Sequence, residues 1–154
     1  MTSSVDRRLA ELGLVLPDAP RPLGAYRAAV QAGALLFLSG QLPIKDGTLQ
    51  YKGRVGAELT LEEGRAAAEL TALNALAQIR RFLGGFDRLR QVVRLEGHVA
   101  SAPDFYEQPK VLDAASELLS RVLGERAGHA RSAFAATHLP ANAAIELIVT
   151  AEVE

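Results

Sequence analysis

The feature of the sequence that most constrains its fold is a long helical repeat between Thr60 and Gly85. Thr60 and Glu63 have the spacing of a capping box, in which the threonine hydroxyl accepts from the backbone of Glu63 while the glutamate carboxylate accepts from the threonine N–H. Apolar residues then recur at helical spacing over about six turns. Gly84-Gly85 ends the repeat, because glycine readily adopts the left-handed conformation at a helix terminus. The sequence therefore predicts one long helix here.

The other segments carry either helical or strand periodicity. A second long helix is predicted from Pro109 to just before Gly124, and a short helix over 4–13 with Ser3 or Ser4 as its cap. The predicted non-helical segments are a proline-rich connector (16–24), a hairpin (25–31 and 34–38), loops with room for one short strand (39–59), and strands at 91–100, 130–138 and 143–153.

This order, ββαβαββ after a leading helix, predicts an α+β fold with one sheet and two long helices on one face. The length of 154 residues fits a single domain spanning 1–154, in which 1–20 is an N-terminal helix and connector. In the last strand Ile148 shares a face with Glu146 and Thr150, so the second face of the sheet is partly apolar. We expect a further subunit to cover it, in a closed cyclic oligomer.

Composition excludes several classes of function. Hydrophobic residues make up 49% and charged residues 23%, which is typical of globular proteins, and the formal net charge of −1 gives no general attraction to nucleic acid. Without cysteine there is no disulfide framework, thiolate metal site or cysteine nucleophile, which fits a reducing compartment. No apolar run is long enough for a membrane span and no export signal is evident, so we predict a cytoplasmic protein.

Three residues stand out as candidates for chemistry, although each also has a plain structural explanation. Arg131 enters a strand after a Gly-His turn, and its guanidinium could bind a carboxylate through two parallel hydrogen bonds or simply pair with a surface acid. Glu146 could act as a proton shuttle if partly buried beside an arginine, or could be one solvated position of an alternating strand. Tyr26 could offer its phenol to a ligand or pack with an exposed tip.

Other familiar sites are not predicted. None of His98, His129 and His138 has the helical spacing of a metal pair, so no metal is expected. Ser39 and Ser132 lie outside any G-x-S-x-G turn, which argues against a serine hydrolase, and the glycine loops that cradle nucleotides do not occur.

Three ordered blocks resemble the reactive-intermediate deaminase (Rid, YjgF-like) superfamily, also called the L-PSP endoribonuclease family. They are LGAYRAAVQAGALLFLSGQLP (23–43), GFDRLRQVVRLEGHVASAPDF (85–105) and HARSAFAATHLPANAAIELIVTA (129–151), and together they span most of the chain. The resemblance implies a chorismate-mutase-like α+β fold with a mixed sheet, and a homotrimer whose sheets form a central barrel with clefts between subunits.

The resemblance also implies an activity, the hydrolysis of reactive imines or enamines to 2-oxo acids and ammonia, without metal or organic cofactor. Arg131 matches the arginine that holds the carboxylate of a small metabolite, Glu146 the glutamate near the reacting water, and Tyr26 the tyrosine of the cleft. Ser39 and Gly40 match the adjoining backbone segment, and Ser132 and Ala133 follow the arginine.

The sequence departs from the family pattern at three places. Ala133 stands where cysteine is common, Gln108-Pro109 stands near where asparagine is expected, and the loop over 45–64 also differs, lacking the usual glutamine. These departures leave a second reading open, a trimer that binds a small carboxylate metabolite without turning it over. RNA cleavage is a third reading, which the near-neutral charge and the absence of basic and aromatic patches disfavour.

Overall fold

The computed structural model describes residues 3–154, and its centre is a five-stranded mixed sheet with the order β1-β2-β7-β5-β6. Neighbouring strands run antiparallel except for β5 and β6, which are parallel and are joined through α3. The strands of this sheet are β1 (Ala29–Ala32), β2 (Leu35–Leu38), β5 (Leu89–Ala100), β6 (Ala130–Ala136) and β7 (Ile145–Val153). A separate two-stranded hairpin is made by β3 (Ile44–Lys45) and β4 (Thr48–Leu49).

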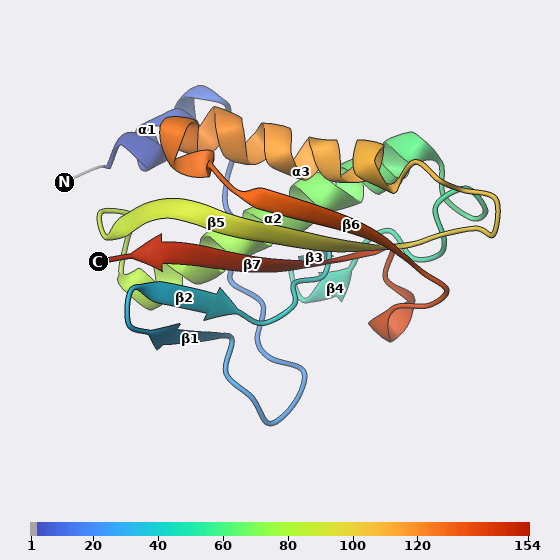
Figure 1. Ribbon diagram of the computed structural model, residues 1–154, viewed down its shortest axis with the longest axis horizontal. Coiled ribbons are helices and arrows are strands. Elements are labelled where there is room, and N and C mark those ends of the chain that lie inside the picture. Colours follow the sequence, from blue (N-terminus) through green and yellow to red (C-terminus); the bar gives the residue numbers. More distant parts are fainter. Residues whose placement is uncertain (1–2) are drawn as a thin grey trace.

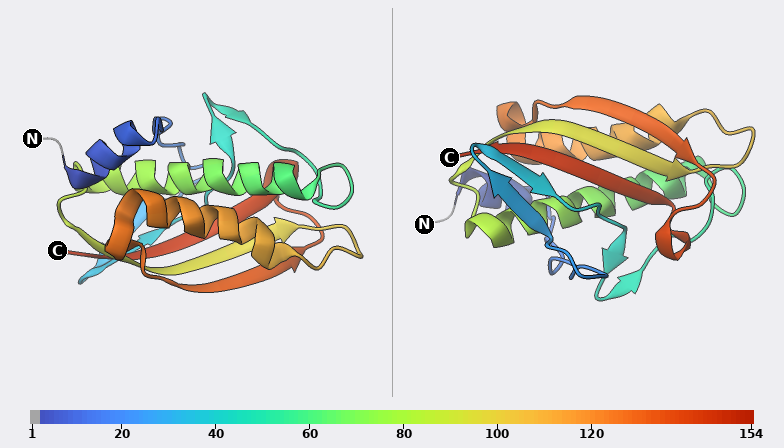
Figure 2. Two further views of the ribbon diagram at one scale, coloured as in Figure 1. Left: turned by 90° about the horizontal axis from the view of Figure 1, so that it is seen from above. Right: turned by 60° about the horizontal axis from the view of Figure 1, so that its bottom comes forward.

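Helices α2 (Leu61–Leu83) and α3 (Gln108–Leu123) lie side by side across one face of the sheet (Figures 1 and 2). The short α1 (Ser4–Glu11) packs against α3 and buries Val5 and Leu9. Two short 3-10 turns, η1 (Gly124–Ala127) and η2 (Pro140–Asn142), precede β6 and β7. The α+β class, the mixed sheet and the two long helices on one face are thereby confirmed.

The hydrophobic core lies between these helices and the sheet. Every second residue of β7 is buried in it, so Ile145, Leu147, Val149, Ala151 and Val153 point toward the helices. We call this side of the sheet the covered face. The helices approach it through small residues of α2, including Ala68, Ala72 and Ala75, and through larger ones of α3.

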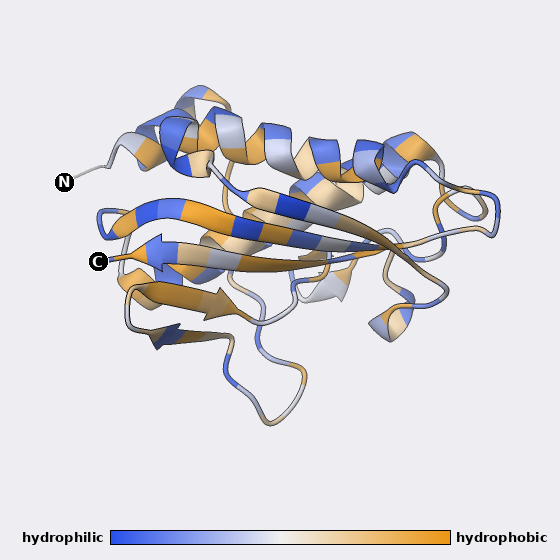
Figure 3. Cartoon of the chain, viewed as in Figure 1, coloured by the Kyte–Doolittle hydropathy of each residue, from blue (hydrophilic) through white to orange (hydrophobic). Residues whose placement is uncertain are grey.

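The opposite side of the sheet, which we call the open face, is covered by no helix of residues 3–154 (Figure 2). It carries Glu146, Ile148 and Thr150 of β7, and their cross-strand neighbours. Several large apolar side chains there are exposed, such as Phe37 at 44% and Phe134 at 46%. Figure 3 shows that β2 is apolar along its length, and its residues Leu35 and Phe37 are the exposed ones. The partly apolar second face expected from the sequence is therefore present.

The helix ends were predicted well. The Thr60–Glu63 capping box is formed, with Glu63 N donating to Thr60 Oγ1 at 3.1 Å, and Gly84 ends α2 with a φ of 73°. Ser3 is the cap of α1, and α3 begins at Gln108, one residue before Pro109.

Several strand predictions need correction. The first strand begins at Ala29 and not at residue 25, because residues 23–26 form a bend that is closed by a bond from Leu23 N to the Tyr26 hydroxyl. The loop at 39–59 holds two short strands, since Gly47 with a φ of 74° turns Ile44–Lys45 back on Thr48–Leu49. The strand predicted at 91–100 is β5, which begins two residues earlier, at Leu89. The last two strands are shorter than predicted, because β6 ends at Ala136 and β7 begins only at Ile145.

Candidate functional site

Glu146 is the centre of the candidate site. Strand alternation on β7 places it on the open face, where its cross-strand neighbour on β5 is His98. The side chain is half-buried, and within residues 3–154 its carboxylate has no hydrogen-bond partner. Burial raises the pKa of the Glu146 carboxyl above its usual value, and the nearby His98 opposes this shift. A carboxyl in this state is suited to exchange protons with a ligand.

The backbone at Gly40 runs directly against this carboxyl group. Gln41 and Leu147 exchange two backbone hydrogen bonds, of 2.8 and 3.0 Å, which fix the segment 39–41 beside β7. A Cβ added at Gly40 would overlap Oε2 of Glu146. Glycine at position 40 therefore permits this close approach of Glu146, and its backbone angle is not an unusual one.

Ser39 and Tyr26 complete the local arrangement. The Ser39 hydroxyl donates to the carbonyl of Arg27 at 2.6 Å, so it ties the segment to the residue after Tyr26. The Tyr26 hydroxyl accepts from Leu23 N at 3.1 Å, which leaves its own proton free for a ligand, and the side chain is 53% exposed.

Tyr26, Ser39, Gly40 and Glu146 all line one small cavity of about 70 Å³. Four of the predicted site residues are thus brought together from the connector, the segment after β2, and β7. The cavity also contains two buried glutamines that the sequence reasoning missed. Gln78 of α2 donates to Pro20 O at 2.7 Å and to Gln41 Oε1 at 3.3 Å. A polar residue within the mainly apolar repeat of α2 was the available signal for Gln78, but Thr71 and Asn74 of the same helix give the same signal.

Arg131 lies elsewhere in the same chain. It is paired with Leu95 in the β5–β6 register, and Leu95 is buried on the covered face, so Arg131 and Glu146 lie on opposite faces of the sheet. Arg131 Nη1 donates to Asp113 Oδ1 at 2.9 Å and to Ser116 Oγ at 3.2 Å. Nη2 makes only a 3.5 Å contact with Pro109 O, so the Nε–Nη2 edge of the guanidinium keeps donors for a ligand.

The two residues after Arg131 also lie on β6. Ser132 is on the open face, where its hydroxyl accepts from Arg94 Nη2 at 2.9 Å, and Ala133 is partly buried against the core. Because β6 is an edge strand of the sheet, this segment is available to another molecule.

The histidines have other partners. His98 contacts Glu96 at 3.1 Å and stacks on Phe134 with ring centroids 5.2 Å apart, while His129 contacts Ser116 and Ala127 O. Over residues 3–154, no three of His, Cys, Asp and Glu gather as metal ligands would. None of the helices in that part of the chain is both long and apolar enough to cross a membrane.

Comparison with known proteins decides the family. A family model described as "YjgF/chorismate mutase-like, putative endoribonuclease" matches residues 6–153. The chain belongs to this YjgF-like family. The resemblance of its three sequence blocks is thereby confirmed, and the YjgF-like fold accounts for the strand–helix order.

Relatives of this YjgF-like protein are similar over nearly their whole length. Protein TCP17 of Trypanosoma cruzi is 42% identical over 144 residues, which cover 93% of this chain and 90% of that protein. The crystal structure of Atu1372 from Agrobacterium tumefaciens, of unknown function, is 40% identical with a TM-score of 0.92, over 98% of this chain and 93% of that one. A Shewanella oneidensis protein described as a putative endoribonuclease is 37% identical with a TM-score of 0.95, over 98% and 100% of the two chains.

Proposed function

We propose that this YjgF-like protein hydrolyses the imine and enamine forms of 2-amino acids to 2-oxo acids and ammonia, at clefts between the subunits of a homotrimer. The observation that carries the proposal is Glu146, a half-buried carboxyl without a hydrogen-bond partner among residues 3–154, whose pKa is raised by burial. It faces the Gly40 backbone and shares a cavity with the Tyr26 phenol. Proton donors and acceptors thus surround a space that is closed on one side.

The reaction needs little more than these groups. Water adds to the carbon of the protonated C=N bond, its electron pair forms the C–O bond, and the π electrons move to nitrogen. Glu146 accepts the proton that the water loses and returns it to nitrogen, after which the C–N bond breaks and ammonia leaves. The remaining hydroxyl loses its proton to solvent and becomes the oxo group. Because a protonated imine is already electrophilic, orientation contributes more than a strong base.

Arg131 would hold the substrate carboxylate in this reaction. Since Arg131 and Glu146 lie on opposite faces of one chain, the arginine of a neighbouring subunit must supply the anchor. The Nε–Nη2 edge of Arg131 matches the geometry of a carboxylate, and Ser132 and Ala133 would border the same cleft. The exposed Phe37 and Phe134 on the open face support a subunit contact there.

The activity is tested by ammonia release from 2-aminoacrylate generated in solution. We expect saturable acceleration by the wild-type protein, and a loss of about 100-fold or more in both Glu146→Gln and Arg131→Ala, the range seen when a group that positions or moves a proton is removed. Glu152→Gln is the matched control, because it makes the same change on the same face of β7. Unchanged rates in Arg131→Ala would refute its assignment.

Mixing the two inactive variants tests whether the site is shared between subunits. In randomly mixed trimers, about one site in four would combine an intact Glu146 with an intact Arg131 from its neighbour, so about a quarter of the activity should return. Light scattering would show the mass of three chains. Failure to recover activity after confirmed subunit exchange would show that no site combines Glu146 of one subunit with Arg131 of another.

A second candidate, binding without turnover, is favoured by the residues around Arg131. Gln108 is buried, and its amide is already bonded to Ser101 Oγ and Phe105 O, so it cannot reach a substrate. Asp113 already neutralises Arg131 in part. Stabilisation of the protein by 2-oxo acids, together with unchanged ammonia release across a panel of imines, would select this candidate.

A further inference from the structure

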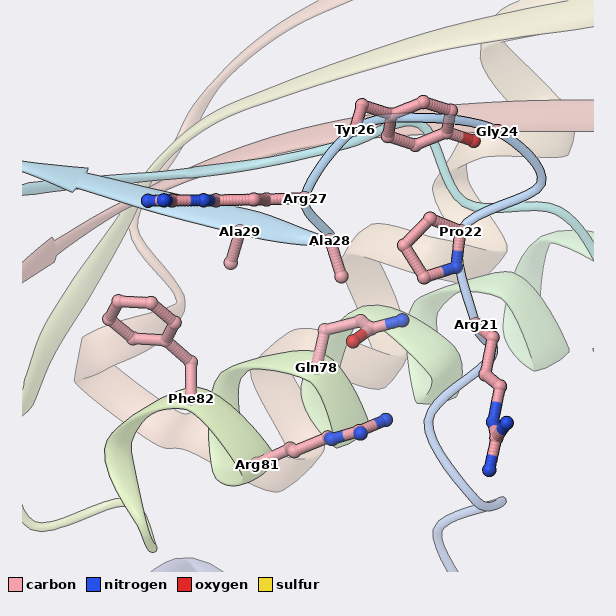
Figure 4. A pocket seen from close by; sticks show the side chains of 10 residues that line it. All are labelled: Arg21, Pro22, Gly24, Tyr26, Arg27, Ala28, Ala29, Gln78, Arg81 and Phe82. Carbon is pink, nitrogen blue, oxygen red and sulfur yellow. The ribbon is translucent and has the colours of Figure 1, made fainter.

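A second, larger cavity adjoins the Glu146 site but has a different character. It has a volume of about 790 Å³ and lies between the connector, the start of β1 and the last turns of α2 (Figure 4). Three arginines line it: Arg21, Arg27 and Arg81. The rest of its wall is formed by small or apolar residues, by the Tyr26 and Phe82 rings and by Gln78.

These three arginines have no acidic partner. More than half of the arginines elsewhere are paired with an acid, as Arg121 is with Glu69 at 2.8 Å and Arg80 with Asp6 at 3.8 Å. In contrast, throughout residues 3–154 no hydrogen bond or ion pair engages the guanidinium of Arg21, Arg27 or Arg81. No aspartate or glutamate lines the cavity. Since the whole chain has a formal net charge of −1, this concentration of positive charge is local.

An ordinary structural role explains only part of this arrangement. Arg81 lies in the last turn of α2, where a cation is favoured by the helix dipole, but Arg80 in the same turn satisfies that role as well. Arg21 and Arg27 are on the connector and before β1, so no helix end accounts for them. Figure 4 shows Arg81 extending from α2 across the floor of the cavity, while Arg27 runs along the opposite wall above Phe82. Charges from three separate elements thus border one space.

We propose that this cavity binds a small organic phosphate, with its phosphate groups on the arginines and a planar group against the aromatic wall. A single carboxylate would leave two of three positive charges uncompensated, whereas a phosphate ester carries about −1.5 to −2 and offers three acceptor oxygens. Arginine forks suit phosphate oxygens. Phe82, 42% exposed, and Tyr26 offer ring faces on which a planar group can stack. The volume is within the range of about 300–1,000 Å³ typical of small-molecule sites.

The proposed phosphate site binds a different class of ligand from the proposed imine-hydrolysing site, and the proposal does not depend on that activity. The two cavities share Arg21, Tyr26 and Gln78, so a bound phosphate would lie next to the Glu146 cleft. Binding is therefore measured directly, and not through activity.

The experiment is calorimetric titration of the intact protein with adenosine 5′-diphosphate and with inorganic pyrophosphate, which carry similar charge. We expect saturable binding of both, with the nucleotide tighter by about threefold or more because its base can stack. Arg81→Gln and Arg27→Gln should each weaken binding by about tenfold, as expected for the loss of a charge-assisted hydrogen bond. Affinity should fall steeply as salt rises from about 50 to about 200 mM.

Arg54→Gln is the matched control. It removes the same charge near the opposite end of α2, and Arg54 does not line the cavity. Circular dichroism and the unfolding temperature establish that each variant is folded. The proposal is overturned if pyrophosphate and nucleotide fail to bind at millimolar concentration, or if the cavity variants bind as tightly as Arg54→Gln.

Two further outcomes would also overturn it. If single-stranded RNA binds while both small phosphates do not, the arginines bind a nucleic-acid chain and not a small organic phosphate. If the cavity variants change the oligomeric mass and no phosphate binds, the arginines neutralise acids of a neighbouring subunit. If the nucleotide binds no more tightly than pyrophosphate, Phe82 and Tyr26 do not stack on the ligand, and that part of the proposal is wrong.

Discussion

The two faces of the sheet differ in how tightly the alternating residues of one strand, β7, are packed. On β7, Leu147 is fully buried under the helices, whereas its neighbour Ile148 on the open face keeps part of its surface exposed. The same contrast separates two glycines. A Cβ at Gly97 would overlap the buried Leu112 of α3, and a Cβ at Gly40 would overlap the Glu146 carboxylate. At position 97 the packed core leaves no room for a side chain, and at position 40 the Glu146 carboxylate occupies that space.

The largest expected effect compares adjacent residues of β7. Leu147→Ala should lower the free energy of unfolding by about 2–5 kcal/mol, because it leaves a cavity under the helices. Ile148→Ala should cost less than about 1 kcal/mol in the single chain, since its side chain is only partly buried there, and more in the homotrimer proposed above, where a neighbouring subunit would cover it. Urea unfolding measures both. A cost for Ile148→Ala as large as that for Leu147→Ala would show that the open face is packed as tightly as the core, and hence covered in the assembly.

The second comparison uses the two glycines. Gly97→Ala should destabilise by about 1–3 kcal/mol, because Leu112 is enclosed and cannot move away. Gly40→Ala should change stability by less than about 1 kcal/mol, since the half-buried Glu146 can turn aside. That displacement should nevertheless reduce ammonia release by about tenfold or more. The contrast fails if Gly40→Ala unfolds the protein or leaves the rate of ammonia release unchanged.

The smallest effect concerns the pH dependence of stability. Since the folded-state pKa of Glu146 is raised, the folded protein binds this proton more tightly than the unfolded chain does. The associated stability is present at pH values below the unfolded pKa and is lost as pH rises through the folded pKa. Glu146→Gln should therefore raise the unfolding temperature slightly, by about 1–2 °C, at pH 7–8 and not at pH 4.

Differential scanning calorimetry across that pH range measures the effect, with Glu152→Gln as its control. The reasoning is wrong if the difference between Glu146→Gln and the wild type is the same at every pH.

Much of the fold could be predicted because it depends on local signals. The Thr60–Glu63 capping box and Gly84 determine the ends of α2 through contacts within a few residues, and β7 shows its buried face in every second residue. The start of β1 was missed because it depends on Tyr26, whose hydroxyl closes a bend that no periodicity shows. The parallel pairing of β5 with β6 joins residues some 36 positions apart, as in Arg94 with Ala130.

The candidate site was predictable only in part, and its residues had to be supplied by family resemblance. Pattern alone left Glu146 as one acid among several, because its partial burial arises from Gly40, over a hundred residues away. The face on which Arg131 lies follows from its register with Leu95, which the sequence does not specify. No sequence motif marks Arg21 or Arg81, and their proximity could not be predicted, because only the folded chain places the connector beside the end of α2.

Residues 21–26 comprise the end of the connector and the bend at Tyr26. They contribute no residue to a sheet ladder, yet they line both cavities. Substitutions in such a segment disturb few buried contacts, so they are tolerated far more readily than changes on β7. Selection, natural or in the laboratory, can accordingly change the lining of both cavities by varying positions 21–24 and 26 while the sheet and helices beneath them stay constant.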